Sequence, residues 1–274
     1  MLLLGLTGSI ATGKSTVSNV LRAPPYNLAI IDADLLARKV VEPGTSGYNK
    51  IVTHFGPTTP DLLHPAEQCG GESGPDGKGR PLNRPALGRR VFGTDSERLS
   101  DRAVLNKIVH PAVRQEMYKT MIKSYLTGHW AVVLDIPLLY ESGWEKLCGT
   151  IMVVAVSDPK IQMQRLRDRD DHLTAEDAEN RVKSQTDVRE KAQRALKRGD
   201  GAGVVVWNDG SEEELKREIA RIMEAVQKKS PQWWAWLLLA VPPLAGVAGA
   251  YSYFKSWQVM KEWNQEKEKE KAKL

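Results

Sequence analysis

A glycine-rich turn near the start of the chain combines a lysine with hydroxyl side chains. Its segment GSIATGKS, residues 8–15, matches the pattern G-x-x-x-x-G-K-[ST] in full and follows an apolar run, residues 2–7. Glycines let a backbone wrap around an anion, and a helix that begins at such a turn directs the positive end of its dipole to the same place. In this pattern Lys14 reaches the β- and γ-phosphates, and Ser15 is a ligand of Mg²⁺. The turn therefore predicts a site for a nucleoside triphosphate and Mg²⁺.

Aspartates stand at the ends of two later apolar runs. Residues 28–33 lead into IDAD, with Asp32 and Asp34, and residues 131–136 contain Asp135. Residues two apart on a strand point the same way, and the carboxyl ends of strands border the ligand crevice of open α/β sheets. We expect Asp34 to accept the proton of an acceptor hydroxyl, and Asp32 and Asp135 to lie near Mg²⁺. The alternative for Asp34 is a cap of the following helix.

A hydrophilic stretch after the run at residues 150–156 is rich in arginine. Arg165, Arg167 and Arg169 cluster at the end of one expected helix, and Arg181 follows on the next. Arginine forks match phosphate oxygens, and such a stretch could move as a lid that excludes water. A solvated helical hairpin with Asp–Arg pairs would have the same composition.

Other residues near these runs have two open interpretations. After Asp135 the chain continues with Leu138, Leu139 and Tyr140, which could form an apolar wall for the acceptor or pack in the core. His110 precedes a proline, and it has either a structural role or a position beside the substrate.

The elements that must position these residues form an alternating pattern. Short, continuous apolar runs occupy residues 2–7, 28–33, 131–136, 150–156 and 204–207, with helical spacing between them. Continuous runs are typical of parallel strands covered on both faces, so the pattern predicts a doubly wound five-stranded α/β sheet. Ser211, followed by three glutamates, predicts a helix start. Residues 57–85 are dense in Gly, Pro, Asp and Ser, which predicts a long, mobile surface loop.

Composition narrows the class of protein. A net charge of +5 suits anionic partners. Cys69 and Cys148 stand far apart without metal-ligand spacing, which fits unpaired thiols in a reducing compartment. The glycine turn leaves no room for a cleaved targeting peptide, so we expect the chain to begin in the cytosol. A GTPase is disfavoured, because DGKG at residues 76–79 lies in the loop and NKIV at Asn106 lacks the aspartate of N-K-x-D.

The C-terminal stretch differs from the rest of the chain. Residues 230–254 contain no charged side chain, and residues 233–254 would span about 33 Å as a helix, close to the bilayer core of about 30 Å. Tryptophans and tyrosines at its edges are typical of membrane interfaces. Pro242 and Pro243 would kink this helix. We expect a transmembrane helix at 230–254 and a charged tail at 255–274, the alternative being a helix docked on the protein's own core.

Several motifs together resemble the dephospho-coenzyme A kinase family over residues 1–226. They read GLTGSIATGKST, IDADLLARKVVEPGTSGY, HFG, LNRPALGRRVF, LNKIVHP, DIPLLYESG, QMQRLRDRD, RVKSQ and WNDGS. The resemblance implies transfer of phosphate from ATP, with Mg²⁺, to the ribose 3′-hydroxyl of dephospho-CoA, the last step of coenzyme A synthesis. It also implies a kinase domain over residues 1–229, with an acceptor lobe at about 35–127 and a lid at about 158–190.

The resemblance further implies roles for single residues. Asp34 would be the base, Lys14 and Arg181 would act on the transferred group, and Arg167 would contact ATP from the lid. The residues holding ATP would be Gly8, Ser9, Ile10, Ala11, Thr12, Gly13, Lys14, Ser15 and Thr16. Asn83 departs from the pattern, since the family usually has Asp there.

We expect a kinase domain facing the cytosol, anchored in the endoplasmic reticulum or mitochondrial outer membrane, with no nucleic acid partner. Two alternatives stay open. One is a kinase for another small metabolite, such as a nucleoside monophosphate. The other is an inactive, membrane-tethered nucleotide-binding module.

Overall fold

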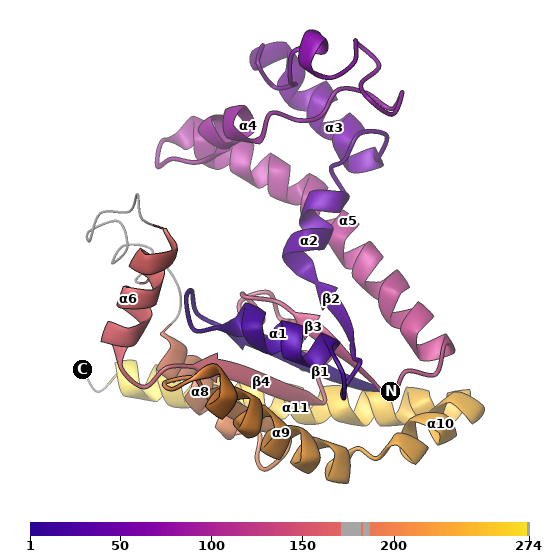
Figure 1. The fold of residues 1–274 in the computed structure, drawn as a ribbon, viewed down its shortest axis with the longest axis vertical. Coiled ribbons are helices and arrows are strands. Elements are labelled where there is room, and N and C mark those ends of the chain that lie inside the picture. Colours follow the sequence, from indigo (N-terminus) through magenta and orange to yellow (C-terminus); the bar gives the residue numbers. More distant parts are fainter. Residues whose placement is uncertain (171–181, 183–186, 273–274) are drawn as a thin grey trace. The chain divides into compact units, whose positions relative to one another are not determined.

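The chain forms two compact units in the computed structural model, which describes residues 1–170, 182 and 187–272. Unit 1 consists of Met1–Ile31 and Ile122–Leu274, and unit 2 consists of Asp32–Met121. Both are drawn in Figure 1. Unit 2 overlaps the lobe expected at 35–127, whose role as the acceptor lobe stays a prediction. Arg181 and most of the expected lid lie outside the described residues.

The sheet contains all the strands that the apolar runs predicted. They are β1 (Leu2–Gly8), β2 (Ala29–Asp32), β3 (Ala131–Asp135), β4 (Thr150–Ala155) and β5 (Gly203–Trp207), in the order β2-β3-β1-β4-β5. The pairs β1–β3, β1–β4 and β4–β5 are parallel. The five-stranded α/β prediction is therefore confirmed. The predicted limits differ from the strands by single residues: Leu28, Ala33, Ile136 and Val156 lie outside them, and Gly8 and Gly203 belong to them. Ala33 already belongs to the next helix.

Helices bury apolar stripes against this sheet. On α9 (Glu212–Lys229), Leu215, Ile219, Ile222, Met223 and Val226 recur at helical spacing and share a core with α1 (Lys14–Arg22). Helix α8 (Val188–Leu196) packs on β4 and β5, and α6 (Pro159–Arg169) follows β4. The predicted start of α9 is confirmed, since the Ser211 hydroxyl accepts the N–H of Glu214 and the Glu214 carboxylate accepts that of Ser211.

Unit 2 is helical and has its own core. Its helices are α2 (Ala33–Lys39), α3 (Ser46–Phe55), α4 (Arg84–Val91) and α5 (Ser96–Leu126, which continues into unit 1), with short turns η1 (Gly56–Thr58) and η2 (Ala66–Gln68). The predicted loop at 57–85 is confirmed as mostly irregular chain, but residues near both of its ends pack against the rest of unit 2. Leu62 and Leu82 are buried in the core of the unit, and Leu63 forms a β-bridge with Leu82.

The prediction of one long C-terminal helix is wrong. The stretch forms α10 (Gln232–Ala240) and α11 (Pro242–Lys271), with a break at Val241, whose φ of −125° and ψ of 78° are not helical. Proline lacks an N–H and disfavours helical geometry in the residue before it, so Pro242 begins a new helix instead of kinking one. Among the described residues no helix combines the length and the apolar character that a membrane crossing requires.

Both C-terminal helices pack against other elements of unit 1, to which they belong. Leu238 of α10 is buried, and its carbonyl accepts a hydrogen bond from the Tyr125 hydroxyl at 2.5 Å. On α11, Ser256 is buried and its hydroxyl accepts a bond from Arg198 at 3.0 Å, while Trp263 is buried further along. The alternative, a helix docked on the protein's own core, is therefore correct for one face of each helix; the other face is exposed. In Figure 1, α11 is the long yellow helix of unit 1.

Candidate active site

The glycine turn joins β1 to α1 through backbone conformations that ordinary side chains rarely adopt. Gly13, the residue before α1, has φ 91° and ψ 16°, and Ala11 has φ 60°. A Cβ at Gly13 would lie 2.2 Å from Nδ2 of Asn208, and one at Gly8 would lie 2.7 Å from the carbonyl oxygen of Val154. Both positions require glycine, because a larger residue would clash at either one, and at Gly13 it would also strain the backbone.

The N-terminus of α1 differs from those of most other helices. Helices α2, α3, α4, α6, α8 and α9 each begin with a side chain that accepts a backbone N–H: Asp32, Thr45, Asn83, Asp158, Asp187 and Ser211. Helix α1 begins at Gly13, with no side-chain cap and no acidic residue in its first turn. Its first N–H groups and the positive end of its dipole are therefore left for an external anion.

Lys14 and Asp135 meet beside this turn. The Lys14 ammonium donates a short hydrogen bond to Oδ1 of Asp135, and the two side chains are 18% and 4% exposed. Asp135 ends β3 opposite Leu6 of β1, so the parallel pairing of the two strands brings it to the lysine. The sequence placed both residues at the site separately, and their direct pairing is an addition from the structure.

Side chains from two distant elements hold the carbonyl groups of the turn. The Gln162 amide donates to the Ile10 carbonyl at 2.7 Å, and the Asn208 amide donates to the Thr12 carbonyl at 2.9 Å. The Arg165 guanidinium donates to the backbone carbonyl of Asn208 at 2.7 Å. Gln162 and Asn208 were not predicted as site residues, although both lie in the motifs QMQRLRDRD and WNDGS. The only signal was their position after strands β4 and β5.

The two aspartates of IDAD differ from the expectation. Strand β2 ends at Asp32, which caps α2 by accepting the Leu35 N–H at 2.9 Å, and Asp34 lies in the first turn of α2. They do not share one face of a strand, because the backbone changes to helix between them. The alternative interpretation, in which Asp34 caps the following helix, is wrong by two residues, because Asp32 is the cap. Both residues lie in unit 2.

The arginines of the expected lid have different surroundings. Arg167 is exposed on α6, and Arg169 pairs with the neighbouring Asp170 at 3.2 Å. Of Arg165, Arg167 and Arg169, which the structure describes, only Arg165 reaches, through Asn208, toward the glycine turn. The Asp–Arg pairing of the alternative interpretation is thus present at Arg169. The ATP contact predicted for Arg167 stays a prediction.

A buried lysine supports the segment that follows Asp135. Lys191 of α8 is 1% exposed, donates to the Pro137 carbonyl at 3.0 Å and pairs with Glu141 at 3.3 Å. Leu139 and Tyr140 are buried, so core packing is confirmed for them, while Leu138 is half exposed.

Charged side chains are also buried next to Tyr140 and Cys148. Arg194 pairs with Glu145 at 3.0 Å and stands over the Tyr140 ring, and Arg198 donates to the Cys148 carbonyl. Burial raises the pKa of Glu145 and Tyr140, raises the pKa of the Cys148 thiol to about 12 and lowers the pKa of Arg198. In each case loss of water disfavours the charged form. Both cysteines are free, as expected.

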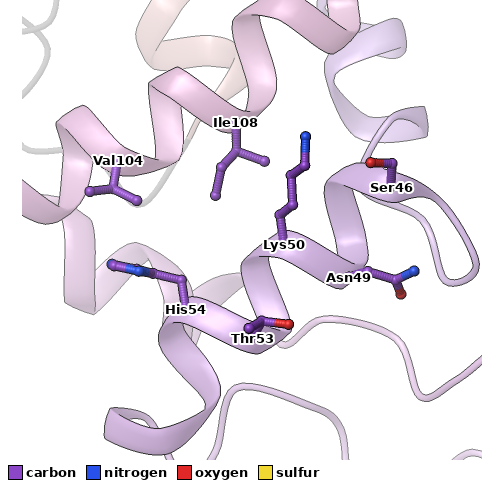
Figure 2. A pocket seen from close by; sticks show the side chains of 7 residues that line it. All are labelled: Ser46, Asn49, Lys50, Thr53, His54, Val104 and Ile108. Carbon is purple, nitrogen blue, oxygen red and sulfur yellow. The ribbon is translucent and has the colours of Figure 1, made fainter.

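Unit 2 contains a pocket of about 650 Å³ between α3 and α5. Figure 2 shows its lining, which comprises Ser46, Asn49, Lys50, Thr53 and His54 of α3, and Val104 and Ile108 of α5. One wall carries hydrogen-bonding groups and a cation, and the other is aliphatic. His110 is exposed on α5 and does not line this pocket. Asn83 caps α4 by accepting the Ala86 N–H at 3.3 Å, and Asn serves there as well as Asp does.

The residues at the glycine turn fit ATP and Mg²⁺. An uncapped helix start, a crowded glycine cradle and Lys14 offer donors and positive charge to a chain of phosphates. Among the described residues no group of three or more His, Cys, Asp or Glu side chains could hold a metal ion. This suits Mg²⁺ in a kinase, where one or two protein ligands act together with phosphates and water.

Comparison with known proteins identifies the family. The family model described as dephospho-CoA kinase matches residues 2–214. The chain is 37% identical to dephospho-CoA kinase CAB5 of Saccharomyces cerevisiae over 267 residues, covering 97% of this chain and 98% of that protein. It is 42% identical to a dephospho-CoA kinase of Bacillus cereus, covering 81% and 95%. A solved dephospho-CoA kinase from Campylobacter jejuni superposes with a TM-score of 0.56 at 25% identity, covering 83% and 98%. The chain therefore belongs to the dephospho-CoA kinase family, and it is an enzyme that uses ATP with Mg²⁺ to phosphorylate dephospho-CoA.

Proposed function

We propose that the glycine turn and Lys14 hold the β- and γ-phosphates of ATP during phosphoryl transfer to the ribose 3′-hydroxyl. The observation that carries this proposal is the uncapped start of α1 beside the buried Lys14–Asp135 pair. Charge on the transferred group is spread over its oxygens, so fixed donors and a cation stabilise it without covalent chemistry. Gln162 and Asn208 act as positioning residues, because they hold the carbonyls of Ile10 and Thr12 and so set the shape of the turn.

Ser15, Asp32 and Asp135 are the residues that we propose for Mg²⁺. Ser15 lies in the first turn of α1, and Asp135 adjoins Lys14. When bound, Mg²⁺ neutralises charge on the phosphate oxygens. Asp135 would then have two neighbours of positive charge, so its carboxylate would link the lysine to the metal site.

Asp34 is the residue that we propose as the base. In the transfer, the 3′-oxygen forms a bond to the γ-phosphorus, the bond from that phosphorus to the β-bridging oxygen breaks, and the hydroxyl proton passes to the carboxylate. The support is its place just after β2, beyond the helix cap supplied by Asp32. Arg167 and Arg181 are proposed to contact the phosphates from a lid at about 158–190, and unit 2 is proposed to bind the acceptor.

The test compares the two aspartates. We expect Asp34→Asn to lower kcat by about 10³-fold while the Kd for ATP is unchanged, because general-base catalysis contributes about 10²–10⁴-fold. Asp32→Asn keeps the cap of α2 and is the matched variant, with a smaller loss that depends on Mg²⁺ concentration. The measurements are steady-state kinetics with dephospho-CoA and equilibrium binding of ATP. A near-normal kcat in Asp34→Asn would show that another group accepts the proton.

We also propose that the enzyme works at a cytosolic membrane surface, on the endoplasmic reticulum or the mitochondrial outer membrane. The support is the set of exposed aromatic side chains on the C-terminal helices, which lie beyond the residues matched by the family model. Fractionation of cells that express the full chain tests the location.

A further inference from the structure

Helix α11 presents its apolar side chains outward. Toward unit 1 it turns Ser252, which lies near Gly149, and the buried Ser256, which bonds Arg198. Outward it turns Val247, Tyr251 and Phe254, which are 67%, 69% and 52% exposed and lie at i, i+4 and i+7. A surface helix of a globular protein normally has the opposite arrangement. Packing among the residues that the structure describes therefore does not explain the outward side chains.

Helix α10 repeats this arrangement. Its inward face buries Ala235 and Leu238, while Trp233, Trp236 and Leu237 are 64%, 55% and 36% exposed at i, i+3 and i+4. We call the exposed side chains of both helices the outer face; it comprises Trp233, Trp236, Leu237, Val247, Tyr251, Phe254 and Trp257. Large exposed apolar patches mark interaction sites, whereas single exposed apolar side chains are ordinary.

Up to Lys261, the charges that the two C-terminal helices themselves carry have one sign. Residues 231–261 contain no aspartate or glutamate, and their only ionic side chains are Lys255 and Lys261. Lys255 is exposed and Lys261 stands over the Trp257 ring, 5.4 Å from its centre. Carboxylates return only at Glu262, on the turn beyond. A partner that covers this face therefore needs an apolar region for the aromatic side chains and negatively charged groups beside it for the two lysines.

We propose that the outer face docks on the surface of a bilayer containing anionic lipid. Tryptophan and tyrosine favour the boundary between headgroups and acyl chains, and lysines there pair with anionic headgroups. A second copy of the chain is a poorer occupant, because the same face of that copy brings lysines and no carboxylate between residues 231 and 261. The inference rests on the proposed membrane location and adds the contacting face and the lipid chemistry. It requires contact with the surface only, not a crossing.

The experiment uses the full chain and vesicles of phosphatidylcholine with or without 30% phosphatidylserine, about a third of the lipid being anionic as in charged membrane leaflets. We expect co-sedimentation and a blue shift of tryptophan fluorescence with the anionic vesicles. Tyr251→Ser/Phe254→Ser and Lys255→Glu/Lys261→Glu should each reduce binding at least about tenfold. Leu196→Ser is the matched control, because Leu196 is 57% exposed on α8 outside the outer face, and its binding should equal that of the unchanged protein.

Kinase activity on soluble dephospho-CoA is measured for each variant and should be unchanged, which separates this inference from the phosphoryl-transfer proposal. Failure of the unchanged protein to bind anionic vesicles would overturn the inference. So would a dimer in analytical ultracentrifugation that Tyr251→Ser/Phe254→Ser dissociates, since the occupant would then be a second copy. Recovery in cellular membranes without vesicle binding would retain the proposed location and reject the lipid contact.

Discussion

The two ends of the chain carry apolar runs of similar character that the protein uses differently. Near the N-terminus, β1 lies between β3 and β4, and its Leu4 and Leu6 have no exposed surface. Near the C-terminus, α10 and α11 contact unit 1 on one side only, and Trp233 and Tyr251 remain more than half exposed. From Leu4 onward the N-terminal run is buried, whereas the C-terminal run has a free surface.

This comparison shows that apolar composition predicts burial only where other elements are available to cover the run. Strand β1 has paired strands on both edges and helices such as α1 and α9 over it. On α11 the side next to Arg198 carries serines, while Val247, Tyr251 and Phe254 face away; Trp263, further along, is buried. Variants at the enclosed end, at the junction where Arg198 bonds Ser256 of α11, and at the free surface should therefore differ in their effects.

The largest effect is expected at the enclosed end, for Lys14→Met. Loss of the cation that faces the phosphates should lower kcat/KM by about 10³-fold, as loss of a single stabilising donor commonly does. Lys216→Met, a change of an exposed lysine on α9, should leave kcat/KM unchanged.

A second variant separates catalysis from folding in this experiment. Lys14→Met alone leaves the carboxylate of Asp135 buried without its partner, which destabilises the protein. Lys14→Met/Asp135→Asn removes that charge and should recover most of the free energy of unfolding while remaining inactive. Activity in the double variant would contradict the role given to Lys14.

At the junction, Arg198→Met should lower the free energy of unfolding by about 3 kcal/mol. The change removes the guanidinium that donates to the Cys148 carbonyl and the Ser256 hydroxyl, and one of the two donors of the Ala202 carbonyl, which keeps the Ile151 N–H. Tyr251→Ser on the outer face should change it by no more than about 0.5 kcal/mol, since that side chain is exposed. Urea unfolding of both variants measures the contrast. Equal losses would mean that the outer face is also packed in the folded protein.

Asn208→Ala tests the bond between β5 and the glycine turn. The Thr12 carbonyl is buried and would lose its donor, a loss of about 1–3 kcal/mol, so the KM for ATP should rise about tenfold or more. Asn49→Ala, a change of an exposed amide in unit 2, should leave the KM for ATP unchanged. An unaltered KM in Asn208→Ala would show that the turn keeps its shape without this bond.

The smallest effect concerns Cys148, which lies between the two ends. Burial raises its pKa from 9.0 to about 12, so its contribution to stability is complete below pH 9 and is lost as pH rises from 9 toward 12. Between pH 8.5 and 10, the unchanged protein should lose about 1 kcal/mol more stability than Cys148→Ala. Cys69→Ala is the control and should follow the unchanged protein. Parallel curves for all three proteins would contradict the buried thiol.

Much of the fold could be predicted because its signals are local. Continuous apolar runs predicted every strand of the sheet, and the glycine pattern predicted the turn before α1. Lys14 and Asp135 could be placed at the site because each follows a strand. Their pairing could not, since it depends on the register between β1 and β3, which no local pattern determines.

The missed features depend on contacts between distant residues. Gln162 and Asn208 look like ordinary helix and loop residues, and only the packed fold brings them to the Ile10 and Thr12 carbonyls. At the C-terminus, length and hydropathy predicted a single helix, but the backbone at Val241 follows the restriction imposed by Pro242. The contacts of α10 with Tyr125 and of α11 with Arg198 also join distant residues, so the hydropathy of the C-terminal stretch could not predict them.

The bond from Asn208 to Thr12 joins residues 196 positions apart in sequence. During synthesis the glycine turn leaves the ribosome first, yet its shape depends on an amide that emerges only when the kinase core is almost complete. A nascent chain shorter than this would present an incompletely formed cradle. Nucleotide capture then begins only after the last strand is in place, so that ATP selectively stabilises finished molecules over partly made ones.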